Sequence, residues 1–267
     1  MFAEVNGTRL YYEVCGSGEP LLLLAGLGGE VSGWHDLIDE IKGFELVAFD
    51  NRGSGKSDKP TGGYSCELMS RDTAALMEHL DIRKAHVLGA SMGGMIAQHL
   101  AIGHPDKVHT LILSSTMGFA ENYTKRNLDI MGELATRLPR EEFVKSISLW
   151  HYSRDFFKCC MDTISSSEEF YLKRAQQPLH AFMGQLEACR NHDTRDLLHR
   201  IKAYTLVITG SQDLIAPPEC STMLSQKIPN SKLVILRGGH ALRAESNEMY
   251  RNEVLNFMTA HPMIKRR

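Results

Sequence analysis

The sequence predicts an α/β fold in which a mostly parallel eight-stranded sheet is flanked by helices, with a helical cap inserted after the sixth strand. Short apolar runs alternate with longer helical patterns over most of the 267 residues, a rhythm typical of a parallel sheet covered by helices. The rhythm stops at about residue 118 and resumes after residue 192. We therefore expect a core formed by residues 1–118 and 193–267 and a helical cap formed by residues 119–192.

The sheet is expected to begin with an antiparallel hairpin. The segment FAEVNGTRLYYEV, residues 2–14, places Asn6-Gly7 between two β-prone runs. Asn-Gly is a strong signal for a two-residue hairpin turn, because both residues tolerate the positive φ that such a turn needs.

Buried strands and amphipathic helices then follow one another. Short apolar runs between turn residues are typical of buried strands, and apolar residues three and four apart predict helices. Before the cap we expect strands at 20–26, 44–50, 85–90 and 108–115 and helices at 33–41, 66–80 and 92–104. After the cap we expect strands at 205–210 and 232–239, a helix from about 217, and a last helix that ends near 260.

The cap and the end of the chain carry two further expectations. Within the cap, helix breaks are expected at Pro139, at Ser165–Ser167 and at Pro178. The basic tail IKRR, residues 264–267, is expected to be solvated.

Composition and charge argue against several classes of function. The chain is 43% hydrophobic and 23% charged, with a net charge of −2 and a pI of about 6.6, so nothing in it requires nucleic acid or an anionic membrane as a partner. The N-terminus lacks the basic start and apolar run of a signal peptide, and the longest apolar run, Leu21–Ala25, is far too short to span a bilayer. We expect a cytoplasmic protein whose partner is a small molecule, with a homodimer left open.

The six cysteines form no C-x-x-C motif and lie at positions 15, 66, 159, 160, 189 and 220. Without an export signal they are expected to be free thiols, mostly buried, in a reducing compartment. Cys159 and Cys160 are adjacent and therefore poorly placed to chelate one metal together. We expect neither a metal nor a cofactor.

A candidate nucleophile lies in the segment HVLGASMGGMIAQ, residues 86–98, where Ser91 stands between Gly89 and Gly93. Gly-x-Ser-x-Gly between a strand and a helix predicts a sharp turn that lifts the serine hydroxyl out of the backbone. The start of the following helix favours a negative charge that develops there. The motif alone also fits a glycine-eased turn with an idle serine.

A base and an acid for Ser91 are found in two later loops. Of the 12 histidines, His240 has the best position, just past a strand and behind two glycines. Asp213 lies in the loop after the preceding strand, where a carboxylate can fix the tautomer of the base. All three residues follow strands at the same edge of the predicted sheet. Three further histidines lie in the cap, where a structural role and a contact with substrate are both open: His151, His180 and His192.

Acyl transfer also needs donors for the developing oxyanion. The N–H of Met92, directly after the nucleophile, is one candidate. The N–H of Leu27 is the other, because it lies in the loop after an apolar strand, where glycines on both sides let the backbone turn towards the substrate.

The segment DNRGSGKSD, residues 50–58, ends in Gly55-Lys56-Ser57 like a phosphate-binding loop. That motif needs glycine five residues before its second glycine, and this chain has Asp50 there. Because an acid is unfavourable near phosphates, we do not expect a nucleotide site.

Together these motifs resemble those of the α/β-hydrolase fold family, and the resemblance covers nearly the whole chain. GASMGG (89–94) matches the family's nucleophile elbow, FDNRGSGKSD (49–58) its structural Asp-x-Arg-Gly-x-Gly-x-Ser loop, TGSQDLIAPP (209–218) its acid loop and GGHALRAE (238–245) its base loop. The order Ser, Asp, His along the chain is the order of the family's catalytic triad. The branch resembled is that of small esterases and lactonases, including 3-oxoadipate enol-lactonases, methylesterases and aminoacrylate hydrolases.

The chain departs from the family's pattern in the oxyanion loop. Relatives usually have His-Gly at the start of this loop, where this chain has Ala25-Gly26, which leaves open what supports the loop. Carbon–carbon bond hydrolases tend to carry Trp after the base histidine, where this chain has Ala241. Haloalkane dehalogenases and epoxide hydrolases use aspartate where this chain has Ser91.

The resemblance implies a serine hydrolase that cleaves an ester or lactone of a small to medium, partly apolar carboxylic acid through an acyl-enzyme intermediate. Carbon–carbon bond hydrolysis and cofactor-free perhydrolysis are the alternatives within the fold, and a non-catalytic ligand-binding protein is the alternative outside enzymes. Six residues are expected to line an apolar acyl site, although packing between cap and core explains each of them equally well. These residues are Trp34, Trp150, Tyr152, Phe156, Phe182 and Met183.

Overall fold

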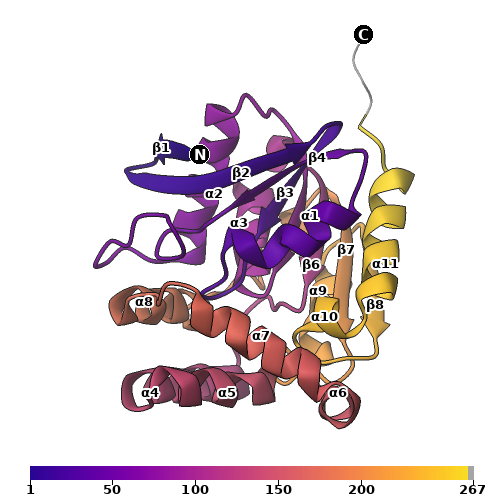
Figure 1. Ribbon diagram of the computed structural model, residues 1–267. Helices are drawn as coiled ribbons and strands as arrows, with labels where there is room; N and C mark the ends of the chain where they lie inside the picture. Colours follow the sequence, from indigo (N-terminus) through magenta and orange to yellow (C-terminus); the bar gives the residue numbers. More distant parts are fainter. Residues whose placement is uncertain (264–267) are drawn as a thin grey trace.

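The protein folds around a single sheet that has helices on both faces. The computed structural model describes residues 1–263, so the basic tail that we expect to be solvated lies outside the described residues. Within them the sheet has eight strands in the order β1-β2-β4-β3-β5-β6-β7-β8. Helices α4 to α8 lie together below one end of the sheet in Figure 1 and form the cap.

The observed bounds of the strands and of the helices on the sheet lie close to those predicted from the sequence. The strands are β1 (Phe2–Val5), β2 (Thr8–Gly16), β3 (Glu19–Leu24), β4 (Phe44–Phe49), β5 (Ala85–Ala90), β6 (Val108–Ser114), β7 (Tyr204–Gly210) and β8 (Ser231–Leu236). The helices on the sheet are α1 (His35–Glu40), α2 (Cys66–His79), α3 (Met92–Gly103), α9 (Pro218–Lys227), α10 (Leu242–Glu245) and α11 (Asn247–Ala260). The cap helices are α4 (Asn122–Arg137), α5 (Arg140–His151), α6 (Arg154–Cys159), α7 (Met161–Lys173) and α8 (Leu179–Arg190).

The predicted hairpin at the start of the sheet is confirmed. Strands β1 and β2 pair antiparallel, with Val5 opposite Thr8. Between them Asn6 has φ +47° and Gly7 has φ +72°, the positive values that a tight two-residue turn requires. Strand β2 then pairs antiparallel with β4, and the ladders from β4 across to β8 are parallel.

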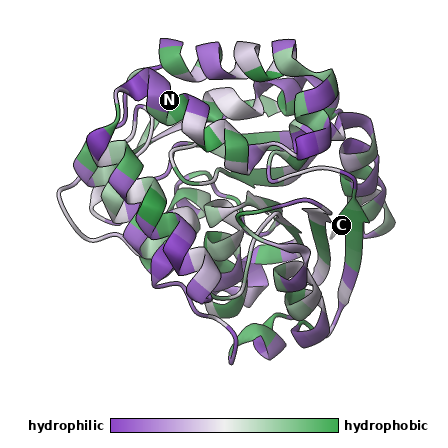
Figure 2. Cartoon of the chain, turned by 90° about the horizontal axis from the view of Figure 1, so that it is seen from below, coloured by the Kyte–Doolittle hydropathy of each residue, from purple (hydrophilic) through white to green (hydrophobic). Residues whose placement is uncertain are grey.

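Strand β3 shows how the sheet divides the apolar core into two clusters. Leu22 and Leu24 belong to the cluster under α2 and α3, whereas Leu21 and Leu23 belong to the cluster under α1 and α11. Successive side chains of a strand point to opposite faces, so an unbroken run of leucines serves both clusters. All four are fully buried, and burial of each side chain contributes about 1.5–3 kcal/mol. The strands are accordingly mainly green in Figure 2, while the helices carry hydrophilic residues on their outer turns.

The cap is inserted between β6 and β7, as predicted, but one of its predicted helix breaks is wrong. Pro139 and Pro178 each precede a helix, whereas Ser165–Ser167 lies inside α7. Serine costs only a few tenths of a kcal/mol in a helix when it faces solvent, and the neighbouring Ile164 is fully buried and anchors that turn. The helices break instead at Ser153, whose side chain accepts a hydrogen bond from the Phe156 N–H and caps α6, and at Cys160, between α6 and α7.

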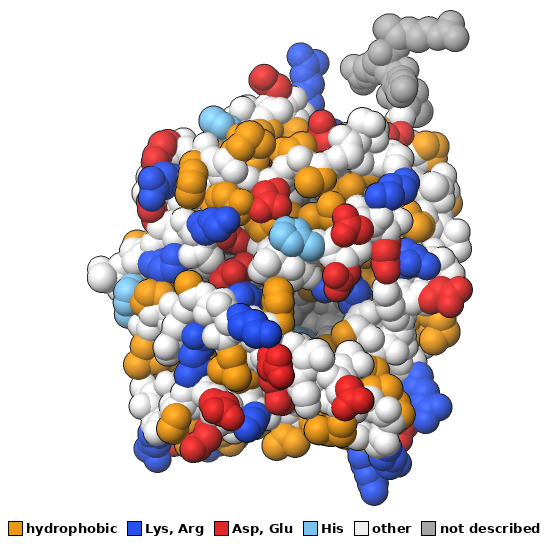
Figure 3. All heavy atoms as spheres, in the orientation of Figure 1, with side chains coloured by type: hydrophobic (Ala, Val, Ile, Leu, Met, Phe, Trp, Pro, Cys, Tyr) orange, Lys and Arg blue, Asp and Glu red, His pale blue; other side chains and the backbone are white. Residues whose placement is uncertain are grey.

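The cysteines, the surface charges and the helix lengths can each be compared with the expectations from the sequence. The cysteines are buried less often than expected, because Cys66, Cys189 and Cys220 are buried while Cys159 is exposed and the other two are intermediate. Charges of both signs are interspersed with apolar side chains on the face shown in Figure 3. Among residues 1–263, no helix combines the length and apolarity needed to cross a membrane.

Candidate active site

Ser91 occupies a sharp turn between β5 and α3. Its backbone has φ +53° and ψ −120°, and its N–H donates to the Ser114 carbonyl at 2.9 Å. The turn depends on glycine, because a Cβ on Gly89 would lie 2.3 Å from the Gly93 oxygen and one on Gly93 would lie 2.0 Å from the Leu24 oxygen. The sequence thus folds here into the strained strand-to-helix turn that presents a hydroxyl above the sheet.

His240 lies in the loop after β8 and reaches Ser91. Its Nε2 is 2.9 Å from Ser91 Oγ, and its Nδ1 is 3.0 and 2.9 Å from the two carboxylate oxygens of Asp213. Both side chains are shielded from water, with exposed fractions of 8% for His240 and 0% for Asp213. In the arrangement that uses every donor, Ser91 donates to Nε2 and Nδ1–H donates to the carboxylate.

The carboxylate of Asp213 is held by its own loop. Its Oδ1 accepts the backbone N–H groups of Ile215 and Ala216, each at 2.9 Å. These bonds fix the direction of the carboxylate towards His240 before any substrate binds. Three residues that are far apart in the sequence therefore form one continuous line of hydrogen bonds.

The two predicted oxyanion donors are sequence neighbours of Gly26 and Ser91. Gly26, which precedes Leu27, approaches Ser91 so closely that a Cβ on it would lie 3.1 Å from Ser91 Cβ and 3.7 Å from Oγ. Met92 is the first residue of α3, where helix N–H groups have no partner in the helix. Within residues 1–263, neither the Leu27 N–H nor the Met92 N–H donates to another protein group.

Three side chains support the oxyanion loop, in which Ala25 replaces the usual histidine. The buried Asn51 donates from Nδ2 to the Ala25 carbonyl at 3.1 Å. Gln185 of α8 accepts the Gly28 N–H at 3.0 Å, and Arg174 donates to the Gly28 carbonyl at 3.0 Å. Both of the latter residues come from the cap, so the cap contributes to the shape of this loop.

The loop that follows β4 is structural, as its resemblance implies. The Asp50 carboxylate accepts the N–H groups of Val31 at 2.7 Å and Lys56 at 2.8 Å. Its burial raises the pKa of this carboxyl above the ordinary aspartate value. Asp50 therefore joins the loop after β4 to the chain just past the oxyanion loop.

His151 lies against the candidate base, a contact that the sequence could not specify. Its ring stacks on that of His240, with centroids 5.8 Å apart and planes 16° from parallel. Its carbonyl oxygen accepts the Ala241 N–H at 2.7 Å. Burial lowers the pKa of His151 to about 3, so this imidazole is neutral at physiological pH. Its position at the end of α5, opposite the base loop, follows from how the cap docks rather than from any local motif.

The six predicted acyl-site residues are not gathered into one surface. Tyr152 follows His151 directly, is 7% exposed and stacks on Phe156 with centroids 5.4 Å apart. Trp150 and Phe182 pack against the apolar cluster under α2 and α3.

The remaining two of the six lie elsewhere. Trp34 is 5% exposed and belongs to the apolar cluster under α1 and α11, with the Arg243 guanidinium 5.7 Å from its ring centre. Met183 is 37% exposed and packs over Gly132 of α4. A role in substrate binding stays a prediction for all six residues.

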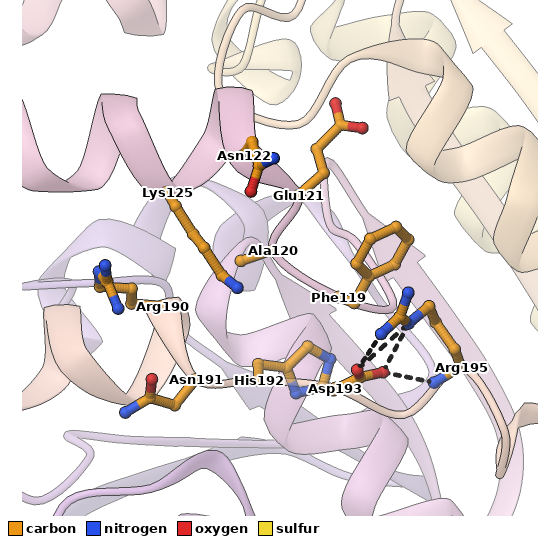
Figure 4. Close-up of a pocket in the computed structure, with 10 residues that line it drawn as sticks. All are labelled: Phe119, Ala120, Glu121, Asn122, Lys125, Arg190, Asn191, His192, Asp193 and Arg195. Carbon is orange, nitrogen blue, oxygen red and sulfur yellow. Dashed lines mark hydrogen bonds and ion pairs between the residues drawn. The ribbon is translucent and has the colours of Figure 1, made fainter.

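Two hollows open elsewhere on the molecule. One of about 500 Å³ lies between α5, α6 and the acid loop, where its apolar lining includes Leu149, Tyr152, Phe157 and Leu214. The other, of about 400 Å³, lies where the cap joins the core and has a polar lining (Figure 4). Neither is lined by the serine or by the candidate base.

Two arginines that line the hollow in Figure 4 are already paired. Arg195 forms an ion pair with Asp193, which also lines the hollow. Arg190 forms an ion pair at 2.8 Å with Asp129 of α4. The described part of the chain contains no group of three histidine, cysteine or carboxylate side chains arranged to hold a metal ion. The line of hydrogen bonds from Ser91 to Asp213 therefore remains the best candidate for chemistry.

Comparison with known proteins finds relatives over nearly the whole chain. A model of the α/β hydrolase fold family matches residues 19–245. RutD of Azorhizobium caulinodans, a protein whose name assigns it carbamate hydrolysis, is 27% identical over 263 residues, which cover 96% of this chain and 97% of that protein. Among solved structures, an enol-lactonase from Burkholderia xenovorans is 25% identical, with a TM-score of 0.88 over 97% of this chain and 100% of that one. A thermophilic esterase from Thermogutta terrifontis is 26% identical, with a TM-score of 0.84 over 98% and 99% of the two chains. The chain therefore belongs to the α/β hydrolase fold family.

Proposed function

We propose that this protein is a serine hydrolase that cleaves an ester or lactone of a small to medium, partly apolar carboxylic acid. The observation that carries the proposal is the line of hydrogen bonds in which His240 Nε2 lies 2.9 Å from Ser91 Oγ and Nδ1 lies 2.9 Å from Asp213. A serine hydroxyl becomes nucleophilic only when a base removes its proton, and a buried carboxylate holds that base in the required tautomer.

The proposed reaction passes through an acyl-enzyme. His240 takes the proton of Ser91 as Oγ attacks the carbonyl carbon, and the N–H groups of Leu27 and Met92 donate to the oxyanion. The carbon–oxygen bond of the substrate then breaks, and His240 gives its proton to the leaving oxygen. Water, deprotonated by the same imidazole, then attacks the acyl carbon. The bond from this carbon to Oγ breaks, His240 returns the proton to Oγ, and the acid is released. Asp213 stabilises the imidazolium in both steps.

The surroundings of the serine favour an acyl group without charge. Arg174, which donates to the oxyanion loop, is already paired with Glu30 at 2.7 Å, and the buried Arg52 is paired with Asp72. The partly buried Leu27, Trp150 and Phe182 pack on the same apolar cluster. The esterase and the enol-lactonase among the structural neighbours support this choice of substrate class.

Carbamate hydrolysis is the second candidate, because two relatives matched over 96% and 94% of the chain carry that activity in their name. Ser91, activated by His240, would attack a carbamate carbonyl in the same way. The two candidates differ in the group bonded to the acyl carbon, which is carbon in an ester of a carboxylic acid and nitrogen in a carbamate.

A panel of substrates tests the proposal. We expect hydrolysis of p-nitrophenyl esters of graded acyl length or of lactones, and labelling of Ser91 by a fluorophosphonate. Ser91→Ala should lower kcat by a factor on the order of 10⁶, whereas Ser166→Ala, on the exposed surface of α7, should leave it unchanged. Hydrolysis by Ser91→Ala at the wild-type rate would overturn the proposal.

The same panel separates the alternatives. A preference for p-nitrophenyl carbamates over matched esters would favour the second candidate. Turnover of a vinylogous diketone alone would favour carbon–carbon bond hydrolysis, and Ser91-dependent peracid formation would favour perhydrolysis. A protein that binds these compounds but neither hydrolyses them nor reacts with the fluorophosphonate is a non-catalytic member of the fold.

A further inference from the structure

The cap and the loop that carries the candidate base meet in a buried junction. Helix α5 ends at His151, and its carbonyl accepts the Ala241 N–H at 2.7 Å. The two imidazole rings, of His151 and His240, stack directly beside this bond. The residue after His240 is therefore bound to the cap through the backbone, and this bond needs no particular side chain.

A single carboxylate completes the junction. Glu245 of α10 accepts the Gly239 N–H at 2.9 Å and the Ser153 N–H at 2.8 Å with Oε1. Its Oε2 accepts the Ser153 hydroxyl at 2.5 Å. Glu245 thus joins the residue just before the base to the first turn of cap helix α6, since Ser153 also caps that helix.

The junction has no room for rearrangement. Ser153 is 3% exposed, and a Cβ on Gly239 would lie 2.7 Å from the Ser153 nitrogen, 2.8 Å from the His151 oxygen and 2.9 Å from the Glu245 carboxylate. Hydrogen bonds to a carboxylate are stronger than those between neutral groups, and a buried donor that loses its acceptor is strongly unfavourable. The backbone on both sides of His240 is consequently fixed, before it by Glu245 and after it by the His151 carbonyl of the cap.

We propose that Ser153 and Glu245 are positioning residues for His240, so that the docked cap sets the place of the base as well as covering the site. The inference rests on the proposed function, because it assigns these residues a role in that reaction. They touch neither the serine nor the acid; they act through the backbone at Gly239 and, with the His151 carbonyl, at Ala241. A base displaced by about 1 Å loses on the order of 100-fold in rate, because proton transfer from the serine depends on distance and angle.

The test compares Glu245→Ala, Glu245→Gln and Ser153→Ala with the wild type on a p-nitrophenyl ester. Rates are expressed per serine titrated to completion with a fluorophosphonate, so that misfolded protein does not count. We expect Glu245→Ala to lower kcat by about 100-fold with KM changed less than about threefold. Glu245→Gln keeps an oxygen acceptor for both N–H groups and should stay within about tenfold of the wild type, as should Ser153→Ala.

The control is Glu248→Ala, an exposed carboxylate at the start of α11, which should leave kcat unchanged. Where Glu245→Ala yields too little folded protein, Ser153→Ala combined with Glu245→Gln replaces it, and their effects should be non-additive because the two side chains share a bond. The positioning role is overturned if Glu245→Ala keeps the wild-type kcat, whether or not its KM and thermal stability change. The proposed function would survive that result as long as hydrolysis still depends on Ser91. Wild-type hydrolysis that does not depend on Ser91 would instead overturn the proposed function and this role with it.

Discussion

Ser91 holds a backbone conformation that residues with a side chain rarely adopt. A φ of +53° outside glycine costs on the order of 1–3 kcal/mol, and such strain persists only where the surroundings fix it. Here the bond to the Ser114 carbonyl and the close approach of Gly89 to Gly93 fix it from both sides. Asn51 likewise fixes the oxyanion loop, because its side chain donates a hydrogen bond to the Ala25 carbonyl.

Asn51→Ala tests whether that single hydrogen bond replaces the support of the absent loop histidine. The substitution leaves the buried Ala25 carbonyl without its partner, at a cost of about 1–3 kcal/mol, and frees the loop that carries the Leu27 N–H. Because this N–H acts on the oxyanion only, we expect kcat for an ester to fall about 10- to 100-fold while KM changes little. Steady-state kinetics measure both constants.

Asn247→Ala provides the matched control, because it removes a side-chain amide whose bond to Glu40 lies on the exposed surface. It should not change kcat. An equal effect of the two substitutions, or a rise in KM with unchanged kcat in Asn51→Ala, would contradict the role given to the loop.

The sequence supplies the reacting residues of the site but not the residues that position them. Ser91, Asp213 and His240 are identifiable because each lies just past a strand, where the geometry of a parallel sheet brings loops together. The contact of His151 with the base loop and that of Glu245 with Ser153 depend on the angle at which the cap docks, which no local pattern encodes. The same is true of Gln185, which reaches the oxyanion loop from α8.

At the scale of elements, apolar patterning predicts the sheet well because parallel strands are buried on both faces. The leucine run of β3 and the Asn-Gly turn after β1 each leave few alternatives. Helix limits inside the cap are less predictable, because a serine serves equally as a cap or as a solvent-facing helical residue. Ser153 does the first, and Ser165–Ser167 does the second.

Helix α2 is attached to the core by an ion pair whose removal should be costly. Arg52, in the loop after β4, binds Asp72 of α2 through two hydrogen bonds, and the exposed fractions of the two side chains are 8% and 2%. Asp72→Ala leaves a buried guanidinium without a counter-charge, so the free energy of unfolding should fall by about 3–5 kcal/mol. Urea denaturation at neutral pH measures it.

A second ion pair on the same helix is the control. Glu67 and Arg71 lie at 3.1 Å on the solvent-exposed side of α2, with exposed fractions of 64% and 53%. Glu67→Ala should therefore change the free energy of unfolding by less than about 1 kcal/mol. Similar losses in the two variants would show that the buried pair is not what attaches the helix.

For the whole molecule, part of the pH dependence of stability follows from two histidines of the cap, the half-buried His151 and the buried His192. Burial lowers the pKa of His151 and of His192 to about 3, so both are neutral in the folded state. In the unfolded chain an imidazole has a pKa near 6.5. Between pH 6.5 and 3 the unfolded chain binds more protons than the folded protein, so the free energy of unfolding falls as the pH falls.

His192 allows this dependence to be tested without touching the candidate site, since it packs edge-to-face on His99 with centroids 5.2 Å apart. His192→Phe preserves a ring at that contact and removes one titrating group. Between pH 6 and 4 the free energy of unfolding of the wild type should fall more steeply than that of the variant, by about 1.4 kcal/mol per pH unit. Urea denaturation at several pH values gives the two slopes, and His199→Gln, at an exposed position, should keep the wild-type slope. Parallel curves for the wild type and His192→Phe would mean that His192 takes up its proton in the folded state, so that the acid sensitivity has another origin.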